Sequence, residues 1–275
     1  MRDRLYSRIF AYLLLVSISL IVLFPVLYIL TTAFKTNVDA EHFPPKLFKF
    51  DVTTDNIKYL SENEEFWSAV RVSLSVAILT TVVVLFIATP LAYGLARTRF
   101  PGKKLAVLLI TLVQVTPAIV LLVPMFSLVS QFGLYDKILP QVLIISALIL
   151  PFGTWILVAF IKAIPIELEE AAIVDGATHL QVIWLIIRPL LMPGISTVAI
   201  FTLIGAWNEF LVPVIMSESK AQPVTVFILR FITEKNIDYG LLATACAFLF
   251  IPVLLFTIFA KRFIVEGLLA GSTKG

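Results

Sequence analysis

The sequence has 275 residues, of which 60% are hydrophobic and 14% are charged, and its net charge is +3. Soluble globular chains carry about 25% charged residues, so this composition indicates a polytopic membrane protein. The small net charge, with no basic stripe interleaved with aromatic residues, argues against nucleic acid as a partner. The single cysteine, Cys246, excludes an internal disulfide and offers no metal or redox framework.

Apolar runs long enough to cross a bilayer recur along the chain. We expect six transmembrane helices, at 9–34, 72–96, 105–135, 138–161, 189–217 and 239–260. The first run is too long for the apolar region of a secretion signal, and no clear cleavage site follows it. Because the segments 35–65 and 218–238 are polar, we expect them to form loops on one side of the membrane.

Basic residues mark the opposite side. Arginines precede the first run, and a short loop after the second run is strongly basic; its basic residues are Arg97, Arg99, Lys103 and Lys104. Because short cytoplasmic loops are enriched in lysine and arginine, both termini are predicted to be cytoplasmic. The prediction is an all-α membrane protein divided into a first helix with its outer loop at 1–65, a five-helix core at 66–265 with a cytoplasmic loop at 162–190, and a cytoplasmic tail at 266–275.

Inside that cytoplasmic loop, a polar segment at 162–188 separates two apolar runs, and we call it the elbow. Pro165 suits the first position of a helix, where its missing N–H costs nothing. The acidic residues that follow suit the first turns of this helix, because the positive end of the helix dipole stabilises negative charge. Gly176 is placed to end this helix in a left-handed conformation. The elbow is therefore predicted to begin with a short acidic helix.

A second elbow helix is predicted to begin at Thr178, because Thr178 and Gln181 have the spacing of a capping box. Its apolar residues, at helical spacing on one face, are Leu180, Ile183, Trp184, Ile187, Leu190 and Leu191. In the first helix, two small residues, Ala171 and Ala172, would let a partner protein approach the backbone closely. On local chemistry alone, a solvated helical loop explains the same pattern.

The elbow resembles a signature of the permease subunits of bacterial ATP-binding-cassette (ABC) importers. That signature is Glu-Ala-Ala, then Gly after three residues, then Ile-x-Leu-Pro after nine more. Here Glu170-Ala171-Ala172 is followed by Gly176 and by Ile186-Ile187-Arg188-Pro189, with Arg188 in place of the usual leucine. This departure concerns how the second helix meets the membrane surface.

The resemblance implies the type I ABC importer permease fold in the inner (plasma) membrane. In this family the elbow is a coupling helix that docks in a cleft of a separate ATPase subunit. That role is carried over to Glu170, Ala171, Ala172, Asp175, Gly176 and Ala177. The implied partners are a second permease subunit forming a heterodimer, an ATPase dimer, and an extracytoplasmic sugar-binding protein, besides membrane lipid.

Two further stretches resemble the carbohydrate branch of this family, the maltose-type permeases. One is Trp207-Asn208-Glu209-Phe210 within the fifth run, and the other is the glycine-rich end at 262–275. An ionisable residue inside a membrane usually faces the bundle interior or water. Asn208 and Glu209 are therefore candidates for the translocation path or its gate. The alternative is a buried polar group that ties helices together.

The sequence contains no phosphate-binding loop for ATP, no HExxH zinc motif and no GxSxG nucleophile elbow. We therefore expect a transport subunit for a mono- or oligosaccharide, without catalytic residues, metal or cofactor, whose energy comes from a separate ATPase. An alternative is a secondary transporter driven by an ion gradient, with Glu209 as its proton site. An intramembrane enzyme is disfavoured, because no pair of suitably placed catalytic groups lies within the spans.

Overall fold

The computed structural model describes the backbone of residues 2–233 and 236–272, and the side chains of residues 6, 8–233 and 236–258. This part of the chain is helical, apart from loops and two isolated bridges, Lys35 with Val52 and Ile232 with Ile237. It forms two compact units, Met1–Trp67 with Phe227–Ile251, and Ser68–Val226 with Pro252–Gly275.

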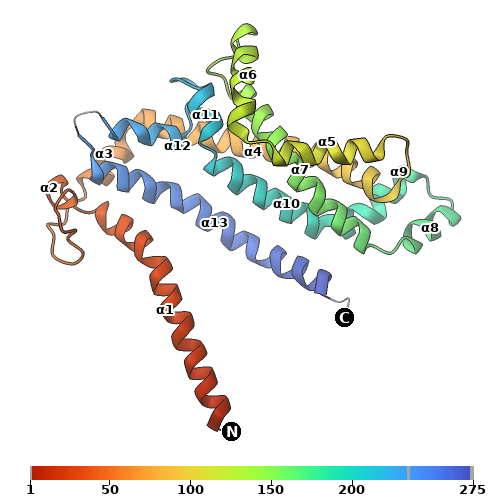
Figure 1. Ribbon diagram of the computed structural model, residues 1–275, viewed down its shortest axis with the longest axis horizontal. Helices are drawn as coiled ribbons and strands as arrows, with labels where there is room; N and C mark the ends of the chain where they lie inside the picture. Colours follow the sequence, from red (N-terminus) through yellow and green to blue (C-terminus); the bar gives the residue numbers. More distant parts are fainter. Residues whose placement is uncertain (1, 234–235, 273–275) are drawn as a thin grey trace. The chain divides into compact units, whose positions relative to one another are not determined.

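The helices follow one another without any intervening sheet in the described residues (Figure 1). They are α1 (Arg2–Thr32), α2 (Asn37–Ala40), α3 (Asp55–Glu62), α4 (Glu64–Arg97), α5 (Lys103–Val115), α6 (Ala118–Gln131), α7 (Ile138–Ala163), α8 (Glu167–Val174), α9 (His179–Gln181), the π-helix η1 (Val182–Ile187), α10 (Arg188–Asn208), α11 (Leu211–Met216), α12 (Val224–Phe227), the 3-10 helix η2 (Ile228–Phe231) and α13 (Tyr239–Ser272).

Among the described residues, five helical stretches are long and apolar enough to cross a membrane. They are Arg8–Thr32, Glu64–Arg97, Ile138–Ala163, His179–Asn208 and Tyr239–Ile258. The pair α5 and α6 meets the same criterion only when taken together, with a bend of 98° at the break between them. The predicted number of six is therefore reached only if this bent pair is counted as one span.

The predicted third span is interrupted at Pro117, which the sequence prediction had placed inside one continuous helix. Thr116 ends α5 in an extended conformation, with φ −75° and ψ 125°. A residue that precedes proline is pushed out of the helical region by the proline ring. Pro117 then becomes the residue that starts α6, so the run 105–135 is two helices and not one.

Three other boundaries differ from the predicted ones. The second span begins at Glu64 rather than 72, because Asn63 Oδ1 accepts a hydrogen bond from Phe66 N at 2.9 Å and starts the helix. The fifth span ends at Asn208 rather than 217. The last helix continues past 260 to Ser272, while residues 273–275 of the predicted tail lie outside the described residues.

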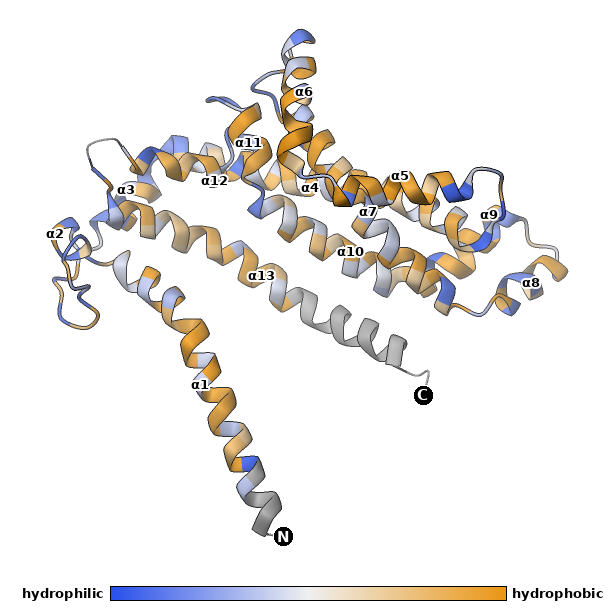
Figure 2. Cartoon of the chain, in the orientation of Figure 1, coloured by the Kyte–Doolittle hydropathy of each residue, from blue (hydrophilic) through white to orange (hydrophobic). Residues whose placement is uncertain are grey.

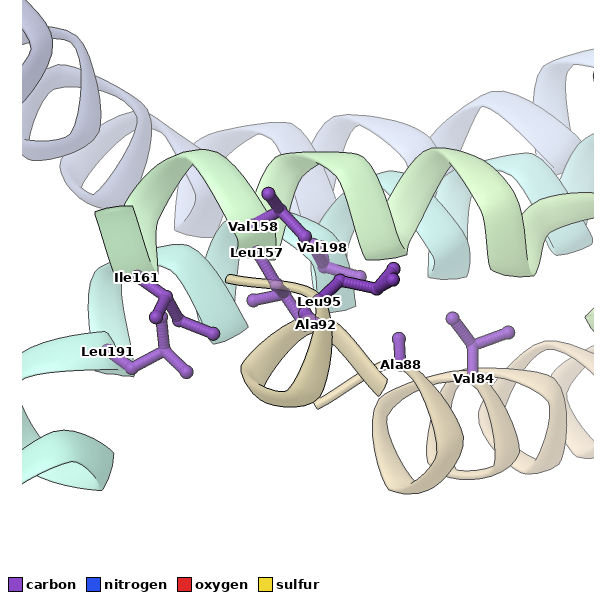
Figure 3. Packing of buried hydrophobic residues seen from close by; sticks show 9 residues of the cluster. All are labelled: Val84, Ala88, Ala92, Leu95, Leu157, Val158, Ile161, Leu191 and Val198. Atoms are coloured by element: carbon purple, nitrogen blue, oxygen red, sulfur yellow. The ribbon is translucent and has the colours of Figure 1, made fainter. Parts of the chain in front are cut away.

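The core of the second unit lies where α4, α7 and α10 meet (Figure 3). Its buried residues are Val84, Ala88, Ala92 and Leu95 from α4, Leu157, Val158 and Ile161 from α7, and Leu191 and Val198 from α10. The α4 members recur every three or four residues, so one face of that helix is buried. This packing fixes the ends of α7 and α10, which flank the elbow.

Close contact between α7 and α10 depends on two glycines. A Cβ atom on Gly194 would lie 2.8 Å from Phe160 Cγ, and one on Gly153 would lie 2.9 Å from Val198 Cγ1. Small residues allow helix backbones in a membrane to approach each other in this way. The α7–α10 contact therefore tolerates no side chain at either position without repacking.

The N-terminal end of α7 is held by Asp136, which has a left-handed φ of 56°. Its carboxylate accepts hydrogen bonds from the backbone N–H groups of Glu218 and Ala221 through Oδ1 and of Lys220 through Oδ2, each at 3.0 Å. Burial by itself raises the pKa of Asp136, but these donors outweigh burial, so its pKa lies below the usual value. Asp136 thus ties the α6–α7 connection to the loop after α11.

In the first unit, the side chain of Phe66 is fully buried and packs edge-to-face against Phe227 and Phe248, with ring centroids 5.9 Å and 5.4 Å away. The Asn56 amide donates a hydrogen bond to the backbone carbonyl of Lys35 at 3.0 Å. These contacts join the segment after α1 to α3, α4 and the start of α13.

Most residues in the described part of α1 are hydrophobic, as its mainly orange ribbon in Figure 2 shows. None of the apolar window of this helix is buried within the chain. Examples of its exposed side chains are Leu13, Leu20 and Ile21, which are 60–73% exposed. Such a surface requires lipid or another protein around it, which agrees with a helix inside a membrane.

Candidate functional site

The first elbow helix, α8, forms in the predicted segment, but Pro165 is not its first residue, because Ile166 is the N-cap. It begins at Glu167, and its first turn contains the three acidic residues Glu167, Glu169 and Glu170. Gly176 has a φ of 90°, and its N–H donates to Ile173 O at 3.0 Å. Ala177 N donates to Ala172 O at 2.9 Å, which completes a Schellman motif. The predicted glycine stop is confirmed.

The second elbow helix begins with the predicted capping box. The Thr178 N–H donates to Gln181 Oε1 at 2.7 Å, and the Gln181 N–H donates to Thr178 Oγ1 at 3.4 Å. Two backbone amides at the helix start are therefore satisfied by side chains.

The predicted apolar face of this second helix is confirmed at Ile187 and Leu191 but is wrong at Leu180, Trp184 and Leu190, which are exposed. Residues Val182–Ile187 form a π-helix, whose wider turn moves later residues out of α-helical register. As a result Val182, Ile187 and Leu191 are buried, whereas Leu180 and Trp184 are 69% and 58% exposed. The buried set is spaced by five and four residues, as a π-turn followed by an α-turn requires.

Six elbow residues were predicted to meet a partner, and they divide between two faces. Glu170, Ala171, Asp175 and Gly176 are exposed. Ala172 and Ala177 instead pack against a small core made by Ile164, Val182 and Ile187. The alanines at these two positions therefore allow the elbow to fold closely on itself.

The exposed side of α8 is unusually apolar for a loop helix. Val174 is 87% exposed, and Ile166, Leu168 and Ile173 are 44–46% exposed. In Figure 1, α8 and α9 lie beyond the ends of α7 and α10, at the tip of these helices. Exposed apolar side chains beside exposed carboxylates are typical of a surface that binds another protein.

The sequence prediction missed the residue that anchors α8, which is Glu169. Its side chain is 8% exposed, and its carboxylate accepts a hydrogen bond from Arg97 Nε at 2.6 Å and one from Tyr93 Oη at 2.9 Å. Arg97 Nη2 also donates to the backbone carbonyl of Ile164 at 2.6 Å. The last turn of α4 is therefore bonded to the elbow on both sides of Pro165.

The local sequence identifies this buried acid only once the inward-packing alanine is known. Glu169 precedes Ala172 by three residues, so both lie on the same side of α8, and Ala172 is the alanine that packs inward. Glu170 is one residue further along and faces outward. The pairing of Glu169 with Arg97, 72 residues away, has no signal in the local sequence.

Arg188, the irregular residue of the signature, is exposed and does not enter the core. Its guanidinium carbon lies 4.8 Å from the centre of the Trp184 ring, a cation–π contact on the outside of η1. The aromatic partner one turn earlier explains how an arginine is accommodated at this position.

Glu209 interrupts the predicted fifth span. It ends α10 with φ −64° and ψ 129°, and its Oε1 accepts hydrogen bonds from Leu211 N at 2.9 Å and Val212 N at 3.1 Å. The carboxylate thus caps α11, while the Asn208 amide donates to Ile204 O of its own helix at 2.9 Å. The two residues lie together at a break between helices. Within the described residues, no group of three His, Cys, Asp or Glu side chains is arranged to hold a metal ion.

Known transport proteins resemble this chain over most of its length. The family model described as "Binding-protein-dependent transport system inner membrane component" matches residues 87–269. The diacetylchitobiose uptake system permease protein DasC of Streptomyces coelicolor is 33% identical over 276 residues, covering 100% of both chains. The trehalose transport system permease protein SugB of Mycobacterium tuberculosis is 33% identical over 256 residues, covering 92% of this chain and 93% of the relative.

Solved structures share the fold. A chain of a bacterial ABC transporter involved in the import of the acidic polysaccharide alginate superposes with a TM-score of 0.80 at 20% identity, covering 95% of this chain and 97% of that one. A chain of the alginate ABC transporter in complex with an alginate pentasaccharide-bound periplasmic protein gives a TM-score of 0.70 at 21% identity, covering 93% of each chain.

Proposed function

The chain belongs to the family of binding-protein-dependent transport system inner membrane components, and from that premise we propose that it forms part of the path for a carbohydrate in an ATP-driven importer. The chain is an ABC importer permease and a multi-pass protein of the inner membrane. The energy for transport would come from a separate ATPase dimer that binds the elbow on the cytoplasmic side. The exposed, partly apolar surface of α8 is the observation that carries the proposed coupling to the ATPase.

The substrate class rests on the relatives. Two permeases named for diacetylchitobiose and trehalose transport are each 33% identical to this chain over nearly their whole length. Both named substrates are disaccharides or their derivatives. We assign a sugar of this general kind to the importer, delivered by an extracytoplasmic binding protein and moved between this subunit and a second permease subunit.

The coupling surface would consist of Glu170, Ala171 and Asp175 around the exposed Val174. Val174 would fill an apolar hollow of the ATPase, and Glu170 would meet a basic side chain there. An ion pair at such a contact fixes orientation, while the buried apolar side chain supplies affinity. Ala172 and Ala177 would serve the same surface indirectly, by holding α8 close to η1.

Force applied at α8 would pass to the membrane through Glu169. The 2.6 Å contact between Arg97 Nε and Glu169 Oε1 connects α8 to the end of α4, and the chain itself connects α8 to α7. Movement of the ATPase would therefore displace two helices of the second unit together. The break at Asn208 and Glu209 is then a candidate gate, because a helix end changes its direction more easily than a helix interior.

The proposal is tested with Val174→Asp in the complete complex reconstituted in lipid vesicles. We expect binding-protein-stimulated ATP hydrolysis and sugar uptake to fall by roughly tenfold or more, as for loss of a central contact residue. Glu170→Lys should act in the same direction. The free energy of unfolding of each variant should stay within about 0.5 kcal/mol of the wild-type value, because both residues are exposed.

The matched control is Val38→Asp, since Val38 is also highly exposed, at 78%, but lies on α2 outside the elbow. It should leave stimulated hydrolysis unchanged. The coupling role is refuted if the correctly inserted Val174→Asp and Glu170→Lys complexes hydrolyse ATP and take up sugar at the wild-type rates. Uptake that persists without any ATPase and collapses with an uncoupler would instead support an ion-driven transporter.

A further inference from the structure

A second feature lies beside the elbow anchor, at the turn between α4 and α5. This turn surrounds an open hollow of about 610 Å³, which we call the basic hollow. Its lining residues are Arg99, Phe100, Gly102, Lys103, Lys104 and Val107. All of them belong to the second unit.

The positive charge of the basic hollow is not neutralised within the part of the chain that the structure describes. Arg97 is paired with Glu169, but Arg99, Lys103 and Lys104 take part in none of the ion pairs seen there. Lys103 Nζ donates one hydrogen bond, to the backbone carbonyl of Thr98 at 3.0 Å. Arg99 and Lys104 are exposed. Three cations therefore face a space that contains no carboxylate.

The start of α5 adds to this positive potential. Gly102 precedes the helix with φ 87° and offers no side-chain cap, so the amide groups of the first turn have no side-chain acceptor from the N-cap. The Lys103 N–H donates to the backbone carbonyl of Phe100 at 3.3 Å. A helix of 13 residues carries partial positive charge at this end. The charge of the hollow thus comes from both side chains and backbone.

The apolar surface next to the hollow indicates what kind of anion fits. No residue of α5 is buried, and Leu105, Leu108 and Leu112 are 58%, 53% and 48% exposed. These leucines lie three and four residues apart, so they form one ridge that begins directly after the lysines. An anion that also has long hydrocarbon chains would contact both surfaces at once.

We propose that the basic hollow binds the headgroup phosphate of an anionic phospholipid, whose acyl chains lie along the leucine ridge of α5. Arg99, Lys103 and Lys104 supply the charge-assisted hydrogen bonds to the phosphate. Phe100 and Val107 cover the glycerol region. A free phosphate ion would gain nothing from the leucine ridge, and a soluble protein would not reach along a helix that lies in the bilayer.

The test measures lipid retained by the complete complex, purified in detergent with its partner subunits, by native mass spectrometry. Phosphatidylglycerol is titrated against phosphatidylcholine with identical acyl chains. A basic side chain near an anionic lipid surface strengthens binding by about fivefold, the equivalent of about 1 kcal/mol. We expect the triple variant Arg99→Gln/Lys103→Gln/Lys104→Gln to lose at least about tenfold in retained phosphatidylglycerol, and the wild type to prefer this lipid over phosphatidylcholine.

Two matched variants control for net charge and for folding. Lys49→Gln/Lys58→Gln/Lys220→Gln removes the same charge from exposed positions elsewhere and should retain the lipid. Arg99→Lys/Lys103→Arg/Lys104→Arg keeps the charge in the hollow and should also retain it. These readouts do not depend on transport, so they stand apart from the test of the coupling surface.

Other outcomes would overturn the proposal. Equal retention of both lipids by the wild type would mean that the hollow does not select an anionic headgroup. Displacement of phosphatidylglycerol by millimolar inorganic phosphate with no effect of the acyl chains would make it a site for a small anion. Loss of the ATPase from the glutamine triple variant, with lipid retention unchanged, would make it a protein contact.

Discussion

Each end of α7 is held by one carboxylate, Asp136 at the N-terminal end and Glu169 at the C-terminal end. The hydrogen-bond donors to these two carboxylates differ. At the N-terminal end, Asp136 accepts hydrogen bonds from several backbone N–H groups of one loop. At the C-terminal end, Glu169 depends on the side chains of Arg97 and Tyr93. Every loop residue except proline supplies a backbone donor, whereas the donors to Glu169 are lost when Arg97 or Tyr93 is replaced. The elbow end is therefore the more easily broken of the two.

The largest expected effect is that of Arg97→Met. Glu169, which is 6% exposed, would then be a buried carboxylate without its counter-charge, and removing one partner of a buried ion pair costs about 3–5 kcal/mol in the free energy of unfolding. Denaturation of the purified permease in detergent measures this loss.

The double variant Arg97→Met/Glu169→Leu is the matched control. Replacing both charges by apolar groups of similar size removes the unpaired charge, so most of the lost stability should return. If the two substitutions instead add independently, the two side chains are not energetically coupled and the anchor is not what holds the elbow end.

An intermediate effect is expected at the other end of α7, when the pH is lowered. Because the pKa of Asp136 is below its usual value in the folded protein, its contribution is fully present above the unfolded-state pKa of about 4. It is lost as the pH falls through the folded-state pKa. The free energy of unfolding, measured between neutral pH and about pH 3, should therefore decrease as the pH is lowered.

Asp136→Asn is the control for the pH effect. Asparagine tolerates the left-handed backbone of this position and keeps one acceptor oxygen, but it does not titrate. The variant should be less stable at neutral pH, with a smaller change on acidification. An identical acid response in wild type and variant would show that other groups control the stability of this end.

The smallest effect is expected for Arg188→Leu, which restores the residue usual in the family signature. Within the described part of the chain, this variant loses the exposed cation–π contact with Trp184, worth about 0.5–1 kcal/mol. Unfolding and stimulated ATP hydrolysis should therefore remain close to wild type. A loss of stability as large as that of Arg97→Met would mean that the outer face of η1, and not Glu169, fixes the elbow.

Local features of the fold were predictable from the sequence. The glycine stop at Gly176 and the capping box of Thr178 and Gln181 each depend on residues within one or two turns, and both are confirmed. The apolar runs located the long helices for a similar reason, because lipid requires continuous apolar segments. The Glu-Ala-Ala stretch was correctly placed on a helix, with Glu170 and Ala171 exposed.

Features that depend on distant parts of the chain were not predictable. The choice of Glu169 rather than Glu170 as the buried acid depends on the position of Arg97, which only the packing of α4 against α7 and α10 determines. The break after Asn208 is favoured by the Glu209 carboxylate, whose capping bonds form only once the chain has turned. Composition alone could not separate such a break from a continuous span.

The π-helix Val182–Ile187 has a consequence for comparing this chain with its relatives. A π-turn accommodates one residue more than an α-turn, in the manner of an absorbed insertion. Each residue of an α-helix advances by about 100°, so every side chain of α10 is rotated by that angle relative to an uninterrupted helix. Leu191 is buried and its neighbour Leu190 is 47% exposed in this phase. Deleting one residue of η1 would turn α10 and expose Leu191, even though the signature on either side remained intact.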